Sequence, residues 1–142
     1  MGTADTADTV GAMRPGSRIA GQVRDFHLAY ELPVASAPSA GLSDGQAELR
    51  QSLIEEEVSE LRAAATDADI VGIADALADI VYVAYGTALV YGIDLDGVLD
   101  EVHASNMTKL GADGRPVRRA DGKILKGPDY RPPDIAAVLR RQ

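Results

Sequence analysis

The segment "DIVGIADALADIVYVAYGTALVY", residues 69–91, decides the fold because it carries apolar side chains on almost every side of a helix. Such a helix is typical of the centre of a bundle, where several neighbours cover it. Gly92 follows in the place of a helix C-cap, and Asp94 is suited to cap the next helix. The sequence therefore predicts a central, buried helix over residues 69–91.

The neighbouring segments predict further helices. Apolar residues recur at helical spacing over residues 17–31, and a capping-box sequence at residues 43–46 opens a helix that runs to about residue 65. Residues 33–42 are typical of a loop, and another helix is expected over about residues 95–110. From Gly111 the chain is rich in Gly, Pro and basic residues, with "RADGK" suited to a short hairpin and "DIAAVLRR" to a small last helix.

The predicted fold class is all-α, a four-to-five-helix bundle with an irregular Gly/Pro-rich C-terminal tail. A central helix that is apolar on every side needs more cover than one small subunit provides, so we expect homodimerisation to complete the core. The 142 residues indicate a single domain over residues 17–142, after a flexible leader over residues 1–16.

Composition excludes several classes of function. The net charge of -8 argues against binding to a nucleic acid polymer or a membrane surface, and a phosphate ligand would need metal ions or a few local basic residues. The absence of cysteine excludes disulfides and thiolate chemistry. The first residues lack the features of a signal peptide, and no apolar run reaches the roughly 18 residues of a membrane-spanning helix. We therefore expect a cytoplasmic protein without a membrane partner.

The stretch "LIEEEVSEL", residues 53–61, places a carboxylate where a surface helix would have none. At about 100° per residue on a helix, Glu57 lies in the middle of an apolar stripe. Glu60 flanks that stripe, Glu56 lies further round the same side, and Glu55 points away. An ionised carboxylate in a core is costly unless it is paired, hydrogen-bonded or metal-bound, so Glu57 requires a partner.

Two more predicted helices direct polar groups toward the core. Asp75 and Asp79 are four residues apart and share a face of the central helix. Asn106 lies within the apolar stripe of the next helix, with Lys109 at its edge. A cluster of acidic oxygens is the preference of a hard cation such as Mg²⁺, with Mn²⁺ as a substitute, and such cations bind phosphate oxygens.

These residues carry a family resemblance. The motif "EEVSE" at residues 56–60 resembles the EExxE of the MazG-like all-α nucleoside triphosphate pyrophosphohydrolases, and "DALADIVYVAYG" resembles the helix of that superfamily that bears ExxD. The segments "VHASNMTKL" and "ADGKILKGPDYRPPD" resemble the branch named phosphoribosyl-ATP pyrophosphohydrolase-like. The resemblance covers residues 23–135, and the order of the three helical motifs makes it fairly specific.

The resemblance implies a set of site residues. Glu56, Glu57 and Glu60 match the first carboxylate group, which holds metal and takes part in catalysis, and Asp79 matches the aspartate of ExxD. The chain departs from the pattern at Ala76, where the family has a glutamate. Asp75 is adjacent and is expected to supply the missing metal ligand, directly or through a water.

The implied activity is Mg²⁺-dependent hydrolysis of a nucleoside triphosphate between the α- and β-phosphates, which yields a nucleoside monophosphate and pyrophosphate. A house-cleaning role on a ribo- or deoxyribonucleotide is expected, in a homodimer or tetramer. The expected substrate contacts are His27, Asn106, Lys109, Lys123 and Lys126.

Two other classes compete with this interpretation. A di-iron carboxylate bundle would need a Glu three residues before a His, and neither His27 nor His103 has one. A non-catalytic dimeric bundle that binds nucleotides or regulates a partner is the stronger alternative, because Ala76 departs from the catalytic pattern.

Overall fold

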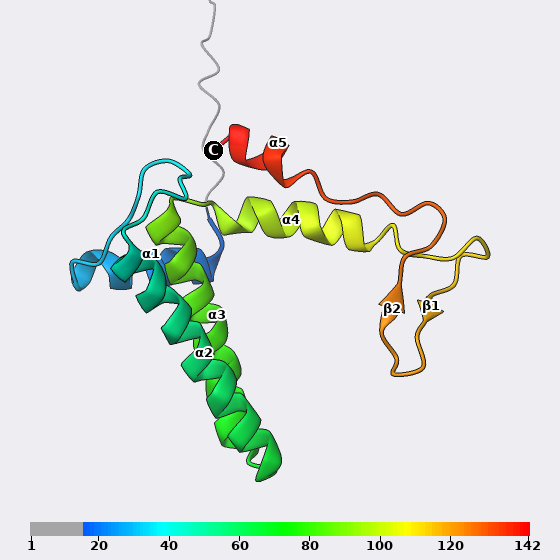
Figure 1. Ribbon diagram of the computed structural model, residues 1–142, viewed down its shortest axis with the longest axis horizontal. Coiled ribbons are helices and arrows are strands. Elements are labelled where there is room, and N and C mark those ends of the chain that lie inside the picture. Colours follow the sequence, from blue (N-terminus) through cyan, green and yellow to red (C-terminus); the bar gives the residue numbers. More distant parts are fainter. Residues whose placement is uncertain (1–15) are drawn as a thin grey trace, which may run out of the picture.

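The computed structural model describes residues 16–142, and five helices dominate it (Figure 1). The predicted leader lies outside the described residues apart from Gly16. The elements in chain order are α1 (Arg18–Ala29), α2 (Asp44–Thr66), α3 (Ile70–Tyr91), α4 (Leu95–Asn106), β1 (Val117–Arg118), β2 (Ile124–Leu125) and α5 (Ile135–Arg140). The helical fold class and the loop at residues 33–42 are confirmed.

Helices α2 and α3 form a long antiparallel hairpin, with α1 against the end of α3 that lies nearest α4 (Figure 1). The caps follow the sequence: the Ser43 side chain accepts a hydrogen bond from the Gln46 amide, and the Asp69 side chain accepts one from the Gly72 amide. Gly92 ends α3 with a left-handed φ of 73°, as a C-cap glycine does. Capping thus fixes the length of the hairpin that carries the acidic residues.

A buried polar junction joins α1, α2 and α3. His27 is 2% exposed, and its Nδ1 lies 2.9 Å from the Pro33 carbonyl oxygen. The Arg50 guanidinium is buried, with Nε donating to Thr87 Oγ1 and Nη2 donating to the Val83 carbonyl oxygen. The Arg50 guanidinium and the His27 ring both approach Gly86, where a Cβ would lie 2.7 Å from Arg50 Nη2 and 2.8 Å from His27 Nε2. A side chain at position 86 would therefore force Arg50 and His27 to move.

Asp96 connects α4 to α1 and α3. Its carboxylate accepts hydrogen bonds from the Ser17 amide (2.7 Å), the Ser17 hydroxyl (2.8 Å) and the Tyr85 hydroxyl (2.7 Å). Burial favours the protonated form, but these three hydrogen bonds outweigh it and lower the pKa of Asp96. One charged side chain thus fastens the start of α4 to the helical body.

The C-terminal region differs from expectation in one respect. Helix α4 ends at Asn106, so the prediction of a helix to residue 110 is wrong, and Lys109 and Leu110 lie outside it. The Thr108 hydroxyl donates to the Ser105 carbonyl oxygen and accepts from the Arg131 amide, which turns the chain away from the helix axis. The predicted hairpin at "RADGK" and the last small helix are confirmed as β1–β2 and α5.

The prediction of a buried central helix holds for one half of α3 only. The half after Ala84 is buried against α1 and the loop at residues 33–42, whereas Ile70 and Val71 at the start are 73% and 76% exposed. Among the described residues the buried apolar side chains are few: Val23, Ala76, Tyr85, Ala88, Val90 and Val138. A single chain therefore leaves much of the first half of α3, its most apolar helix, exposed.

Among the described residues, α3 alone has the length and composition of a helix that could cross a membrane. It holds an 18-residue window with a mean hydropathy of 1.5, which by length and composition alone is enough to cross a membrane. Asp75 and Asp79 interrupt this window, so it is not an uninterrupted apolar run. Core helices of soluble proteins satisfy the same criterion, so the finding is weak evidence for a membrane.

Candidate functional site

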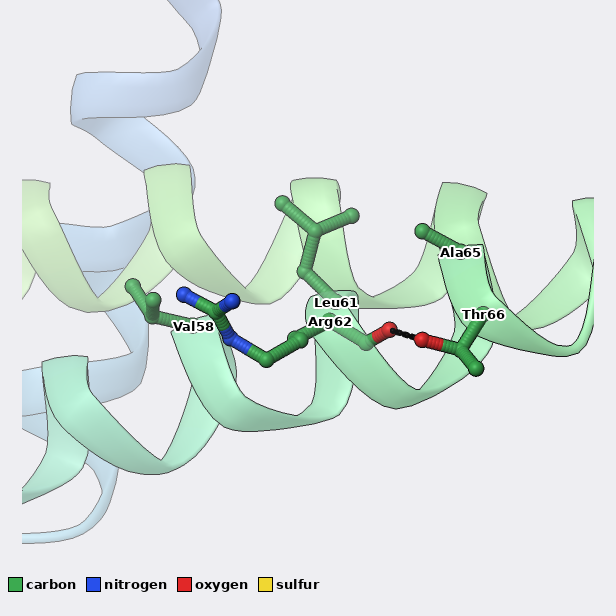
Figure 2. Close-up of a pocket in the computed structure, with 5 residues that line it drawn as sticks. All are labelled: Val58, Leu61, Arg62, Ala65 and Thr66. Atoms are coloured by element: carbon green, nitrogen blue, oxygen red, sulfur yellow. Dashed lines mark hydrogen bonds between the residues drawn. The ribbon is translucent and has the colours of Figure 1, made fainter.

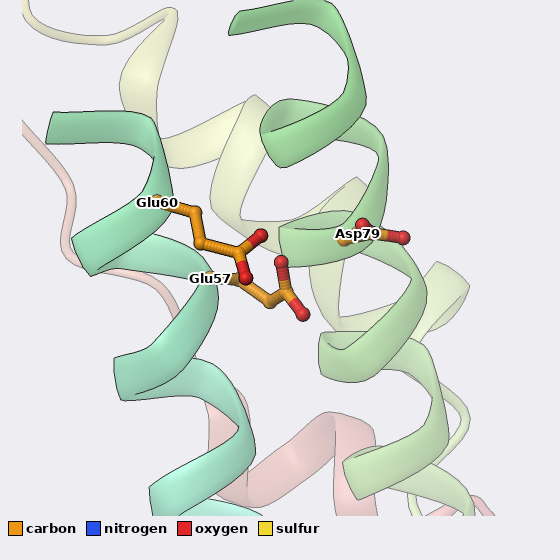
Figure 3. Close-up of side chains that lie close together, drawn as sticks. All are labelled: Glu57, Glu60 and Asp79. Carbon is orange, nitrogen blue, oxygen red and sulfur yellow. The ribbon is translucent and has the colours of Figure 1, made fainter. Parts of the chain in front are cut away.

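Three carboxylates from α2 and α3 converge (Figure 3). Glu57 and Glu60 extend from one side of α2, and Asp79 lies on the adjacent helix α3. One oxygen from each residue lies within 4.8 Å of the other two. We call these three side chains the carboxylate triad.

Glu57 is the most constrained member of the triad. Its side chain is half-buried, and its Oε2 atom is buried without a hydrogen-bond partner. Burial raises the pKa of Glu57, and repulsion from Glu60 and Asp79, a hydrogen bond with Glu60 and repulsion from Asp75 raise it further. The charged form of Glu57 therefore lacks a compensating positive group among the described residues.

The triad fits a divalent cation. Hard cations such as Mg²⁺ take oxygen ligands, and carboxylates held at short mutual distance repel one another unless positive charge lies between them. The buried Oε2 atom of Glu57 has no hydrogen-bond partner, so it is a ligand atom that is already desolvated. The arrangement therefore offers a cation site built from two adjacent helices.

The other predicted acidic residues lie around the triad without joining it. Asp75 is exposed, although it is close enough to raise the pKa of Glu57. Glu56 is also exposed, and the structure does not bring it into the triad. Ala76 is 1% exposed and offers no oxygen at the position of the family's glutamate. Position 76 therefore adds no ligand oxygen to the triad, and Asp75 is the nearest further acidic residue in sequence.

The predicted substrate contacts are not gathered at the triad. Asn106 ends α4, and Lys109, Lys123 and Lys126 lie on the segment that follows, which extends away from the α2–α3 hairpin (Figure 1). Lys126 lies with its Nζ 4.7 Å from the centre of the Tyr130 ring. His27 is buried at the junction with Gly86. Within one chain, these five residues are separate from the carboxylates.

Sequence reasoning missed Arg50, the buried cation of α2. It lies two helical turns before Glu57 on the same side of α2, and burial lowers its pKa. A charged residue on the apolar stripe was the signal that could have found it, as it found Glu57. Arg50 bonds to α3 backbone and hydroxyl oxygens, so it positions α2 against α3 rather than facing solvent.

A shallow depression lies further along α2, separate from the triad (Figure 2). It has a volume of about 480 Å³ and is lined by Val58, Leu61, Arg62, Ala65 and Thr66. The Thr66 hydroxyl donates to the Arg62 carbonyl oxygen, and no acidic side chain lines the depression. Its lining is mostly apolar, which suits packing against another surface better than it suits a triphosphate.

Comparison with known proteins identifies the family. The family described as "Phosphoribosyl-ATP pyrophosphohydrolase" matches residues 23–106 of this chain. These residues include α2, α3 and all three carboxylates. A comparison with curated proteins finds no match. Among solved structures, a "putative NTP pyrophosphohydrolase" from Exiguobacterium sp. 255-15 is 23% identical over 90% of this chain and 97% of its own, with a TM-score of 0.49. Because the family match covers more than half of its length, the chain belongs to the phosphoribosyl-ATP pyrophosphohydrolase family, within the MazG-like all-α superfamily of pyrophosphohydrolase enzymes.

Proposed function

We propose that the protein hydrolyses a nucleoside triphosphate between the α- and β-phosphates, giving a nucleoside monophosphate and pyrophosphate, with Mg²⁺ as cofactor. The observation that carries the proposal is the triad, in which a buried Glu57 oxygen faces two further carboxylates. Structural carboxylates are normally paired with bases or exposed to water, and a bound cation would account for the buried, unpartnered oxygen of Glu57 beside two further carboxylates. The family's activity on a phosphoanhydride explains why a cation would be held there.

Glu57, Glu60 and Asp79 would hold the ion, with Asp75 as a further ligand directly or through a water. A bound Mg²⁺ supplies neutralisation of the triphosphate and a water of lowered pKa. Glu56 or the exposed carboxylate of Glu60 accepts the proton as a water oxygen bonds to phosphorus and the bond to the bridging oxygen breaks. The pyrophosphate leaves with the bridging oxygen.

One amide and three positive side chains would hold the phosphates and the sugar. Asn106, Lys109, Lys123 and Lys126 are proposed for this role, and they reach a triad only if the C-terminal segment lies against an α2–α3 hairpin. His27 is proposed to support a base pocket at the loop that follows α1, because its Nδ1 lies beside the Pro33 carbonyl oxygen of that loop. A homodimer or tetramer in the cytoplasm is the proposed working form.

A pyrophosphate-release assay with Mg²⁺ tests the activity. The substrates are the common ribo- and deoxyribonucleoside triphosphates, with phosphoribosyl-ATP included, since the family name does not fix the base or sugar. We expect turnover of at least one, and its loss in Asp79→Asn. Absence of turnover on every substrate would contradict the proposal.

One observation favours a second function, nucleotide binding without hydrolysis. Ala76 occupies the position of the family's glutamate and is buried, so an oxygen ligand is missing there. In that case triphosphates would bind with Mg²⁺ and raise the melting temperature, but no pyrophosphate would be released. Replacing Ala76 with Glu distinguishes the two: a gain of turnover from a silent wild type would identify a bundle that has lost its chemistry.

A further inference from the structure

Three pairs of residues face each other across α2 and α3 at a regular spacing. In order along α2, the pairs are Arg50 with Gly86, Glu57 with Asp79, and Ala64 with Gly72. Successive pairs are seven residues apart on both helices. Seven residues make about two turns, or about 10 Å of helix, so the three pairs follow one line of contact. The triad therefore lies in the middle of this line, between two pairs that contain glycine.

Gly72 allows α2 and α3 to approach closely near the turn that joins them. A Cβ at position 72 would lie 3.0 Å from the Ala64 Cβ, whereas an ordinary contact of a Cβ is 3.4–4 Å. The Asp69 amide donates to the Ala64 carbonyl oxygen at 2.9 Å, which fixes the start of α3 against the end of α2. A methyl group at position 72 would therefore move the helices apart by about 0.4 Å or more, because packed interiors transmit strain.

Gly86 has the same role on the other side of the triad. A Cβ there would lie 2.7 Å from Nη2 of the buried Arg50. The Arg50 guanidinium holds α2 to α3, since Nε donates to Thr87 Oγ1 at 3.1 Å and Nη2 donates to the Val83 carbonyl oxygen at 3.2 Å. Val83 lies one helical turn from Asp79. Close contacts on both sides of the triad therefore fix the separation of the two helices.

The separation of α2 and α3 decides which ion the triad fits, because its ligands come from both helices (Figure 3). Mg²⁺ binds oxygens at about 2.0–2.1 Å in near-ideal octahedral geometry, whereas Ca²⁺ binds them at about 2.3–2.6 Å in flexible geometry. Oxygens on opposite sides of the ion are therefore roughly 0.8 Å further apart around Ca²⁺. This difference is comparable to the shift that a methyl group at position 72 would cause.

We propose that Gly72 and Gly86 are positioning residues that hold α2 and α3 at the separation that suits Mg²⁺ and disfavours the larger Ca²⁺. The glycines act through the close approach of the two helices on each side of the triad. This inference rests on the proposed function, since it concerns the ion of that site. A purely structural role for Gly72 is the alternative, because a Cβ there would also lie 2.5 Å from Oδ2 of Asp69, the N-cap of α3.

Calorimetric titration of the whole chain with Mg²⁺ and with Ca²⁺, without nucleotide, tests the proposal. Gly72→Ala should lower the ratio of the Ca²⁺ to the Mg²⁺ dissociation constant by at least about fivefold, because a wider site favours the larger ion. Gly86→Ala should lower the ratio in the same direction. Adding Ala64→Gly to Gly72→Ala moves the methyl group from α2 to α3, so the ratio should return to the wild-type value. That double variant keeps any disturbance of the Asp69 cap, which a purely structural role would leave uncorrected.

Gly45→Ala is the matched control, since a Cβ at this position of α2 meets nothing within 4 Å and the ratio should not change. Asp79→Asn should weaken the binding of both ions, which assigns them to the triad. Far-UV circular dichroism establishes that each variant is helical.

An unchanged or raised ratio in Gly72→Ala would overturn the proposal. A double variant that keeps the altered ratio, or a wild type that binds neither ion at the triad, would overturn it as well. Failure of the proposed hydrolysis is distinguishable, because a wild type that binds Mg²⁺ at the triad and releases no pyrophosphate contradicts the hydrolysis alone.

Discussion

The α2–α3 hairpin and the C-terminal region are built from contrasting chemistry. The hairpin joins two long capped helices, carries ten acidic residues against two basic ones over residues 44–91, and directs three carboxylates to one place. The C-terminal region has a short helix, a two-residue-per-strand hairpin and a basic surface. The chain thus separates the carboxylates suited to a metal ion from the basic side chains suited to a phosphate. A substrate site that uses both must bring the two regions together.

The largest expected effect is the loss of activity when a carboxylate of the triad is removed. We expect Glu57→Gln to lower pyrophosphate release by at least about 100-fold, because the buried oxygen that would bind the cation becomes a weak neutral ligand. Rates are measured with saturating Mg²⁺ and the preferred triphosphate. Glu55→Gln is the matched control, since Glu55 lies on the exposed side of α2. Equal losses in both variants would mean that the overall negative charge of α2, and not the triad, supports turnover.

The next largest effect is expected from a substitution at the buried junction of α1, α2 and α3. Gly86→Ala would place a Cβ against Arg50 and His27, so we expect a loss of about 2 kcal/mol in the free energy of unfolding. Chemical denaturation measures this loss. Gly21→Ala in α1 meets nothing within 4 Å and should instead stabilise the chain by about 0.5 to 1 kcal/mol. A neutral result at Gly86 would show that the junction relaxes without cost.

A smaller effect loosens the link between the two regions. Asp96→Asn weakens three hydrogen bonds that hold α4 to α1 and α3, so we expect a loss of about 1.5 kcal/mol. Because the pKa of Asp96 lies below its ordinary value of 3.8, its stabilisation is present above that pH and is lost as the pH falls through the folded-state pKa. Wild type and variant should therefore converge in stability under acid denaturation. A constant difference down to pH 2 would exclude a role for the charge.

The smallest effect concerns the charge of the triad. The pKa of Glu57 lies above its ordinary value of 4.5, so without metal the folded state binds more protons than the unfolded state. The contribution of Glu57 to stability is then greatest below that pH and falls as the pH rises through the folded-state pKa. Melting curves in a chelator should show this decline in the wild type and less of it in Glu57→Gln.

Metal should reverse that decline. Mg²⁺ at tenfold excess over its dissociation constant should stabilise the wild type by about 1.4 kcal/mol at neutral pH, because the ion binds the folded state only. Calcium-free buffers and a titration with Mg²⁺ establish the specificity. Equal stabilisation of the Asp79→Asn variant would mean that the ion binds outside the triad.

Local features of the fold were predictable because their causes are local. Ser43, Gly92 and Asp94 mark helix ends through side-chain hydrogen bonds and a left-handed glycine, and the sequence predicts all three. Asp69 falls inside the predicted helix, whereas in the structure it is the N-cap of α3. The end of α4 was missed because the turn at Thr108 depends on a hydrogen bond from Arg131, which lies 23 residues away. Contacts between distant residues leave no periodic signal.

The site shows the same division between local and distant causes. Helical phase alone turned Glu57 and Glu60 toward the apolar stripe and set Asp79 on an inward face of the next helix. It also grouped Glu56 and Asp75 with them, although both are exposed in the structure. Phase gives the direction of a side chain from its own helix, but the separation between oxygens depends on how α2 packs against α3.

The sequence alone predicts the helices, most of their caps, the inward direction of Glu57 and Asp79, and the basic character of the tail. These follow from a period of about 3.6 residues, from capping hydrogen bonds and from composition. The packing of the helices, in contrast, brings three carboxylates together as the triad, closes Arg50 and His27 on Gly86, and leaves residues 109–126 apart from the α2–α3 hairpin. Those outcomes depend on how helices far apart in the chain pack together, and no short stretch of residues encodes that packing.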